Sequence, residues 1–217
     1  MMNDEDFRKQ LDLEKDEIYL KNVDKLGSSA NNVHIVDNFL SNEEYQKISN
    51  FLNNYDESSW VKEPWTTERT PKESVPEDIS ELLKKIFQTS RLECMAYYDI
   101  EVSDEFKGDY IIRRWSNGSK MRNHVDTDAQ KHLHIIGMYY LNDDYDGGEI
   151  VFPDYGLKIK PKPNSLIMFP GNENYLHGVL EVLKGFRHTF QVSFIFSGST
   201  FVGPTTEIRK MGGKNYG

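Results

Sequence analysis

The second half of the chain alternates between short apolar or β-branched runs and turn-forming sequences. The runs fall at residues 109–115, 121–126, 133–141, 149–152, 157–160, 165–169, 176–182 and 186–197. Between them stand Ser116-Asn117-Gly118-Ser119, Asp146-Gly147-Gly148 and Pro161-Lys162-Pro163-Asn164. Runs of this length, bounded by such turns, are typical of strands. About eight short strands following two helices predict a mainly β fold, a double-sheet jelly roll with helices packed on one face.

Two helices are predicted before these strands. Ser41 fits an N-cap and Glu44 stands three residues later, which is the pattern of a capping box opening a helix to about Asn54. A second helix is predicted from about Glu77 to about Tyr98, because its apolar residues recur at three- and four-residue spacing. Residues 56–76, between the two helices, are predicted to form a long loop.

The chain divides into three parts. Residues 1–30 are a charged N-terminal arm, for which both a helix and a solvated chain fit the spacing of Phe7, Leu11 and Leu13. Residues 31–202 are the predicted jelly-roll domain. Residues 203–217 form a Gly-rich C-terminal tail.

Composition excludes several classes of protein. The formal net charge is -9, which argues against binding to nucleic acid by neutralisation of phosphates. No apolar stretch approaches the ~18 residues of a membrane span, and the acidic N-terminus does not resemble a secretory signal. Cys94 is the only cysteine, so neither an intrachain disulfide nor a Cys-rich zinc site can form. We therefore expect a cytoplasmic protein with no membrane or nucleic-acid partner.

A metal site is predicted from His124-Val125-Asp126 and a later histidine. Residues two apart on a strand project from the same face, so His124 and Asp126 can converge on one ion. His177 opens another β run and would supply a second imidazole. Two histidines and one carboxylate form the facial triad of non-haem Fe(II) oxygenases, which leaves positions for a 2-oxo acid and dioxygen. The alternative for His124 is a surface histidine beside an acidic turn.

Arg187 is a candidate anion anchor. On the strand 186–197, Phe190, Val192 and Phe194 share one parity, and Arg187 has the other, so Arg187 is predicted to point into the barrel. A buried guanidinium needs an anion, and a carboxylate satisfies it through a bidentate fork. The alternative is an exposed arginine or one paired with a structural acid. The other histidines are expected to lie outside the site: His34, His132, His134 and His188.

Residues 33–196 resemble the prolyl 4-hydroxylase-like branch of the 2-oxoglutarate/Fe(II)-dependent dioxygenases. The motifs that carry the resemblance are Val36-Asp37-Asn38-Phe39-Leu40-Ser41, His124-Val125-Asp126, Tyr139-Tyr140-Leu141-Asn142, Gly147-Gly148-Glu149-Ile150-Val151-Phe152, Ile167-Met168-Phe169-Pro170 and His177 followed by Arg187. The resemblance implies a double-stranded β-helix fold. It also implies Fe(II) held by His124, Asp126 and His177, with Arg187 and Tyr140 binding the distal carboxylate of 2-oxoglutarate.

The resemblance further implies O2 as a reactant, succinate and CO2 as co-products, and ascorbate as an additional cofactor. This chain departs from many relatives at Trp115, where they carry Tyr, and at Arg187, where collagen-type members carry Lys. Trp115 and Arg113 are candidate substrate residues beside the pocket. Trp60 and Trp65 are candidates for a lid over the pocket or for a wall of the substrate site. The alternative, which fits equally well, is that both side chains only pack within the fold.

The substrate class is left with alternatives. A residue within a peptide or protein, with proline as the leading candidate, follows from the resemblance. A free amino acid or small metabolite is the main rival, which a closed pocket would favour. A non-catalytic jelly-roll binding module is the alternative from another class, and the complete set of ligands together with Arg187 argues against it.

Overall fold

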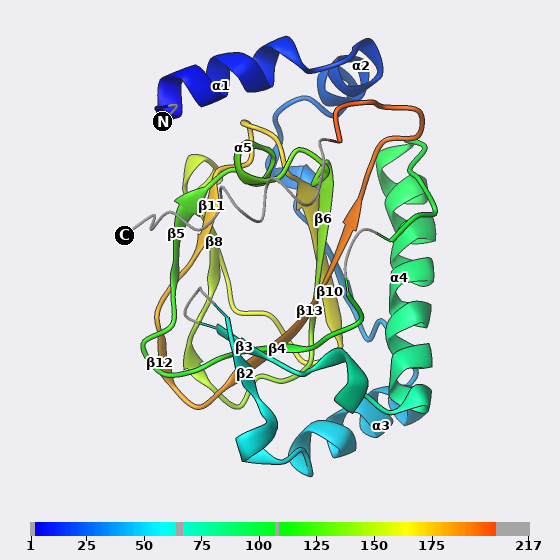
Figure 1. The fold of residues 1–217 in the computed structure, drawn as a ribbon, viewed down its shortest axis with the longest axis vertical. Coiled ribbons are helices and arrows are strands. Elements are labelled where there is room, and N and C mark those ends of the chain that lie inside the picture. Colours follow the sequence, from blue (N-terminus) through cyan, green and yellow to red (C-terminus); the bar gives the residue numbers. More distant parts are fainter. Residues whose placement is uncertain (1–2, 64–66, 107–108, 203–217) are drawn as a thin grey trace.

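Two antiparallel β-sheets face each other, and helices lie against the outer side of the larger one (Figure 1). The computed structural model describes residues 3–63, 67–106 and 109–202. The larger sheet has the order β1 (His34–Asp37), β10 (Ser165–Pro170), β6 (Ile135–Tyr140), β13 (Arg187–Phe194), β4 (Arg113–Trp115), β3 (Thr67–Arg69), β2 (Val61–Lys62). The smaller has the order β5 (Met121–His124), β11 (His177–Val179), β8 (Ile150–Phe152), β9 (Leu157–Ile159). A two-stranded sheet pairs β12 (Val182–Lys184) with β7 (Asp146–Gly147).

Successive strands cross between the two large sheets. The chain runs from β4 in the larger sheet to β5 in the smaller and back to β6, and it makes the same crossings from β10 through β11 to β13. This alternation is the double-stranded β-helix, so the predicted fold class is confirmed. The crossings also place β5 and β11 side by side, in the sheet that faces β6 and β13.

Two segments that were not expected to be strands contain strands. The segment 56–76, expected as a loop, contains β2 and β3, which extend the larger sheet through pairing of Thr67 with Trp115. Residues 146–147, expected as a turn, form β7 against β12. β3 and β7 pair with β4 and β12, which lie far away in the sequence, and local periodicity carries no information about such pairing; β2 then pairs with β3 as a hairpin.

The predicted placement of Asp126 on the same strand as His124 is wrong. Strand β5 ends at His124, and Asp126 begins a one-turn helix, α5 (Asp126–Ala129). The backbone N–H and the hydroxyl of Thr127 both donate to the carbonyl of Gly171, at 3.0 and 3.1 Å. These two bonds turn the chain away from the strand direction immediately after the first histidine.

The two predicted helices are confirmed. Helix α3 (Asn42–Asn53) begins at Ser41 with the complete capping box to Glu44. Helix α4 (Glu77–Tyr98) buries a face at helical spacing against β13, which closes the main core on the outer side of the larger sheet (Figure 1). The buried residues of this face are Ile79, Leu83, Ile86, Phe87, Ser90, Cys94 and Tyr98.

The N-terminal segment is helical. Helices α1 (Asp4–Leu13) and α2 (Glu17–Leu26) lie across one end of the molecule, close to α5 (Figure 1). Leu11 and Tyr19 are buried in the main core. The Asp16 carboxylate caps α2 through Tyr19 N–H and also accepts from Ser199 Oγ at 2.8 Å. The helical alternative for residues 1–30 is therefore confirmed, while the division into arm, domain and tail remains a prediction, and residues 203–217 lie outside the described chain.

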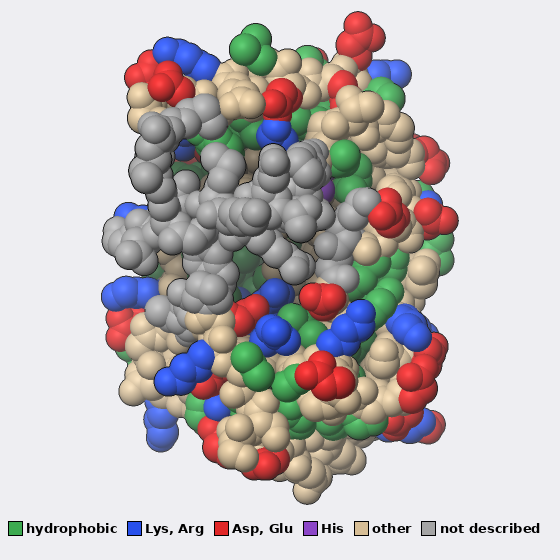
Figure 2. Space-filling model, viewed as in Figure 1, with side chains coloured by type: hydrophobic (Ala, Val, Ile, Leu, Met, Phe, Trp, Pro, Cys, Tyr) green, Lys and Arg blue, Asp and Glu red, His purple; other side chains and the backbone are tan. Residues whose placement is uncertain are grey.

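Charged side chains of both signs are interspersed over the visible face in Figure 2. Among the residues described, no helix has the length and apolar character required to cross a membrane.

Candidate metal centre and adjoining cation

Three side chains meet at the end of the smaller sheet. His124 and His177 are partners in the register of β5 and β11, and Asp126 follows from α5. One ligand atom from each of the three lies within 4.8 Å of the others. Nε2 of His124 is 3.5 Å from Asp126 Oδ1, and Nε2 of His177 is 3.4 Å from Asp126 Oδ2. Two imidazoles and one carboxylate can thus coordinate a single ion.

The second ring nitrogen of each histidine is already engaged. His124 Nδ1 donates to the backbone carbonyl of Arg122 at 2.9 Å, and His177 Nδ1 donates to that of Tyr175 at 3.0 Å. A proton on Nδ1 leaves Nε2 with its lone pair facing the centre, which is how metal-ligating histidines are held. The donor set therefore fits an Fe(II) facial triad.

Electrostatics within the cluster favour a charged carboxylate. Burial acts to raise the pKa of Asp126, but the neighbouring His177 and His124 outweigh it and hold that pKa below its ordinary value. Burial lowers the pKa of His177. Burial also acts to lower the pKa of His124, but its hydrogen bond and charge interaction with Asp126 raise it overall. Asp126 Oδ2 is buried and accepts no hydrogen bond from the described residues, as expected for an oxygen reserved for a cation.

The segments that carry the ligands are supported by the N-terminal 32 residues, through α1 and through the turn that follows α2. Arg8 on α1 lies 3.0 Å from the carboxylate of Asp128 on α5, two residues after Asp126. Tyr175, two residues before His177, is buried, and its hydroxyl accepts from Asn32 Nδ2 at 2.6 Å. These contacts connect sequence-distant residues to both sides of the cluster, and sequence periodicity gave no signal for them.

Arg187 lies at the start of β13 and is 1% exposed. Its Nη2 donates to the Tyr140 hydroxyl at 3.1 Å, and its Cζ lies 5.0 Å from the ring centroids of both Trp115 and Tyr140. No acidic side chain within residues 3–63, 67–106 and 109–202 forms an ion pair with it, and Nε and Nη1 have no hydrogen-bond acceptor there. The predicted inward orientation is confirmed, and the alternative of pairing with a structural acid does not hold among these residues.

Phe190, Val192 and Phe194 lie in the main core with α4, as the alternation on β13 predicts. His188 also lies on that side of the strand, with its ring centroid 5.6 Å from that of Trp60. His134 is buried and bonded at both ring nitrogens, to Phe196 N–H and to the Phe201 carbonyl. His34 is paired with Glu93 on α4 at 2.8 Å.

The predicted substrate residues do not all lie together. Arg113 donates to Glu63 at 2.9 Å, on the side of β4 that also carries Trp115. Trp60 packs instead against the guanidinium of Arg114, at 4.5 Å, on the opposite side of that strand. The contacts of Trp60 therefore agree with the alternative that this side chain packs within the fold. Trp65 lies outside the described residues.

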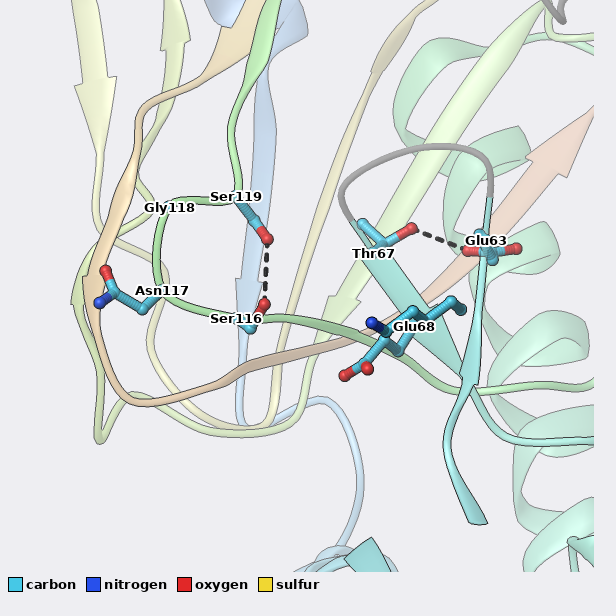
Figure 3. Close-up of a pocket in the computed structure, with 8 residues that line it drawn as sticks. Glu63, Thr67, Glu68, Ser116, Asn117, Gly118 and Ser119 are labelled. Atoms are coloured by element: carbon cyan, nitrogen blue, oxygen red, sulfur yellow. Dashed lines mark hydrogen bonds between the residues drawn. The ribbon is translucent and has the colours of Figure 1, made fainter. Parts of the chain in front are cut away.

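A polar cavity of about 330 Å³ opens beside β4 (Figure 3). One wall is the β2–β3 hairpin and the other is the turn that follows Trp115, where the Ser116 and Ser119 hydroxyls are 3.4 Å apart. The lining residues are Lys62, Glu63, Thr67, Glu68, Ser116, Asn117, Gly118 and Ser119. Glu63 and Glu68 are held by Arg113 and Arg114, respectively.

Comparison with known proteins agrees with this geometry. The model of the 2OG-Fe(II) oxygenase superfamily matches residues 110–195, which contain every residue of the cluster and Arg187. No curated protein matches the chain by sequence.

Many solved structures share the fold. A collagen prolyl hydroxylase of Paramecium bursaria Chlorella virus-1, in complex with 2-oxoglutarate, is 22% identical and matches with a TM-score of 0.59 over 77% of this chain and 97% of its own. A prolyl-4-hydroxylase of Pseudomonas putida is 20% identical, with a TM-score of 0.58 over 82% and 99%. A prolyl hydroxylase of Trichoplax adhaerens, in complex with a peptide fragment of the hypoxia-inducible factor oxygen degradation domain, is 14% identical, with a TM-score of 0.62 over 94% of both chains.

Proposed function

We propose that this chain hydroxylates a residue within a peptide or protein, with proline as the leading candidate. The proposal follows from residues 110–195, which make the chain a member of the 2OG-Fe(II) oxygenase superfamily. The chain is a 2-oxoglutarate/Fe(II)-dependent dioxygenase, and the family implies Fe(II), 2-oxoglutarate and O2. The role of each residue, the peptidyl substrate and the products succinate and CO2 belong to the proposal.

The convergence of His124, Asp126 and His177 is the observation that carries the proposal. Bound Fe(II) would supply the redox chemistry that couples decarboxylation of the 2-oxo acid to hydroxylation of a C–H bond. His124, Asp126 and His177 would hold the ion and, being only three ligands, would leave it able to bind the co-substrate and O2. The Nδ1 bonds to the Arg122 and Tyr175 carbonyls fix the orientation of both rings and leave Nε2 of each as the atom that would bind the ion.

Arg187 and Tyr140 are proposed to bind the distal carboxylate of 2-oxoglutarate. A buried guanidinium without an acid partner is costly, and a carboxylate entering the pocket removes that cost through charge-assisted hydrogen bonds. Both side chains come from strands of the larger sheet, β13 and β6, so the anchor is rigid before the co-substrate arrives. Rigid anchoring orients the 2-oxo group toward the metal and lowers the entropy cost of reaction.

A peptide substrate is favoured by the polar cavity beside β4. An extended peptide presents unpaired N–H and C=O groups, which need polar partners when they leave water. The hairpin and the turn after Trp115 offer hydroxyl, amide and carboxylate groups for this purpose (Figure 3). Similar folds are found in three prolyl hydroxylases, one of them in complex with a peptide. Arg113 would steady this cavity through Glu63.

Two assays separate the alternatives. The iron-loaded protein should form succinate from 2-oxoglutarate, slowly without substrate, whereas a binding module would form none. Mass spectrometry of Pro-containing peptides should then detect a gain of one oxygen that depends on 2-oxoglutarate. A gain on free amino acids alone would favour the metabolite alternative. Omitting ascorbate from the same assay tests whether it sustains turnover.

A further inference from the structure

Polar groups without partners cluster around the Arg187 guanidinium. Besides Nε and Nη1 of Arg187, they are Nε1 of Trp115 and the hydroxyl of Tyr145, none of which has a hydrogen-bond partner among the described residues. Trp115 is 5% exposed and Tyr145 is 4% exposed, so bulk water does not satisfy them. Buried donors are almost always paired, and a group of unpaired ones at one place indicates a missing acceptor.

The backbone brings these groups to one point. Trp115 on β4 is the register partner of Arg187 on β13, and the indole lies 5.0 Å from the guanidinium carbon. Gly148 makes room for Tyr145 on another side. Its φ is +64°, and a Cβ there would lie 3.1 Å from both Arg187 Cδ and Tyr145 Cε2. A side chain at position 148 would be strained by this positive φ, and its Cβ would push the Tyr145 ring or the Arg187 stem aside by a few tenths of an ångström.

We propose that Trp115 and Tyr145 determine co-substrate specificity by donating, with Arg187, to the distal carboxylate of 2-oxoglutarate. The assignment rests on the proposed function, because it names further residues for the same anion. A carboxylate has about four acceptor positions, and two phenols, an indole N–H and a guanidinium can fill them. A 2-oxo acid that ends in a methyl group would leave all these donors buried and unpaired, so it would be rejected.

The protonation state of Tyr145 suits this role. Burial raises its pKa to about 12, although the adjacent Arg187 acts in the opposite direction. The phenol therefore keeps its proton at neutral pH and can donate it to an anion. Trp115 is a donor only, so an acceptor is the single kind of partner that can satisfy Nε1.

The test is calorimetric titration of the full chain loaded with Mn(II), which binds as a redox-inert surrogate. Two acids are compared: 2-oxoglutarate and 2-oxopentanoate, which has the same chain length but no distal carboxylate. Trp115→Phe and Tyr145→Phe should each weaken binding of 2-oxoglutarate roughly 10-fold or more. Binding of 2-oxopentanoate, weak in the unchanged protein, should stay the same in both variants.

Matched controls come from side chains that face away from the pocket. Trp60→Phe removes an indole on the opposite side of β4, and Tyr139→Phe removes a hydroxyl that donates to Asn164 at 2.8 Å. Both should leave the two affinities unchanged. The metal-free melting temperature should fall in Tyr139→Phe, which loses a hydrogen bond to Asn164, and fall less in Tyr145→Phe, whose hydroxyl has only the adjacent Arg187 to interact with among the described residues.

Three results would overturn the assignment. Equal losses for both acids would mean that the two residues only shape the pocket, and unchanged affinity for 2-oxoglutarate would mean that they do not contact it. A fall in the melting temperature of Tyr145→Phe as large as that of Tyr139→Phe would mean that the Tyr145 hydroxyl is already fully engaged within the protein. If the unchanged protein fails to bind 2-oxoglutarate at all, the proposed function falls as well, which distinguishes the two failures.

Discussion

His124 and His177 face each other across β5 and β11 as a register pair, with their ring centroids 4.3 Å apart. Each ring is fixed by an Nδ1 bond to the carbonyl of the residue two positions before it. The strand pairing thus sets the distance between the rings and the backbone sets their rotation. A divalent ion would meet two Nε2 atoms that are already oriented, with Asp126 as the third ligand.

Replacing a ligand should abolish both metal binding and turnover. In His124→Ala or Asp126→Ala, we expect Mn(II) affinity to fall by at least ~100-fold, because even loss of a supporting contact costs 10- to 100-fold. Succinate formation should become undetectable. His34→Ala is the matched control, since that ring pairs with Glu93 away from the centre. Normal metal affinity in Asp126→Ala would exclude this carboxylate as a ligand.

Replacing Arg187 should weaken the binding of 2-oxoglutarate. Arg187→Ala should raise the dissociation constant for 2-oxoglutarate roughly 10- to 150-fold, from loss of a charge-assisted pair worth ~1.5–3 kcal/mol. Mn(II) affinity should stay unchanged. Arg91→Ala is the control, because that guanidinium donates to the backbone carbonyls of Val102 and Ser103. An unaltered constant for 2-oxoglutarate in Arg187→Ala would remove Arg187 from the role.

Asp16 should contribute measurable stability through the N-terminal helices. Partial burial acts to raise its pKa, but hydrogen bonds from Tyr19 N–H, Ser199 and Phe201 N–H lower it to about 2. Asp16→Ala should reduce the free energy of unfolding by about 1–2 kcal/mol at pH 7, measured by urea titration. Since the folded pKa lies below the unfolded one, this contribution is complete above about pH 4 and disappears toward pH 2. Asp24→Ala, at an exposed position of α2, should change little; an equal loss there would refute the assignment.

Acid should destabilise the fold through the buried His134 and the partly buried His188. Burial lowers the pKa of His134 and of His188 to about 4. The unfolded chain therefore takes up protons first as the pH falls from about 6.5, and the stability contributed by each neutral ring is lost down to about pH 4. Each should cost about 2 kcal/mol between pH 8 and pH 5. Urea midpoints of the metal-free protein, recorded with chelator, should show this slope.

The substitutions His134→Gln and His188→Gln should each flatten that dependence. His134→Gln will also lower stability at pH 8, because glutamine cannot reproduce both ring bonds, to Phe196 N–H and to the Phe201 carbonyl. The slope, rather than the absolute value, is the diagnostic quantity. A wild-type midpoint that does not change between pH 8 and pH 5 contradicts the prediction.

Local patterns were sufficient for the elements whose signals lie within a few residues. The capping box of Ser41 and Glu44, the helical spacing over Glu77–Tyr98 and the alternation of β13 each predicted the observed element. The pairing of His124 with Asp126 could also be predicted from a local pattern, because the two residues are only two positions apart in the sequence. The orientation of Arg187 followed from its parity against Phe190 and Val192.

The sequence by itself determined which side chains were available for iron and for a dicarboxylate, because residue chemistry and strand parity are local properties. Only the tertiary structure decided how they meet: Thr127 bonds to Gly171 where Asp126 turns out of β5, and the left-handed Gly148 leaves room for Tyr145 beside Arg187. The packing of α1 and α2 close to the candidate metal ligands likewise involves the hydrogen bond from Ser199 to Asp16. These contacts join segments far apart along the chain, and their free energy exists only once the sheets have closed, so no periodicity in the sequence could encode them.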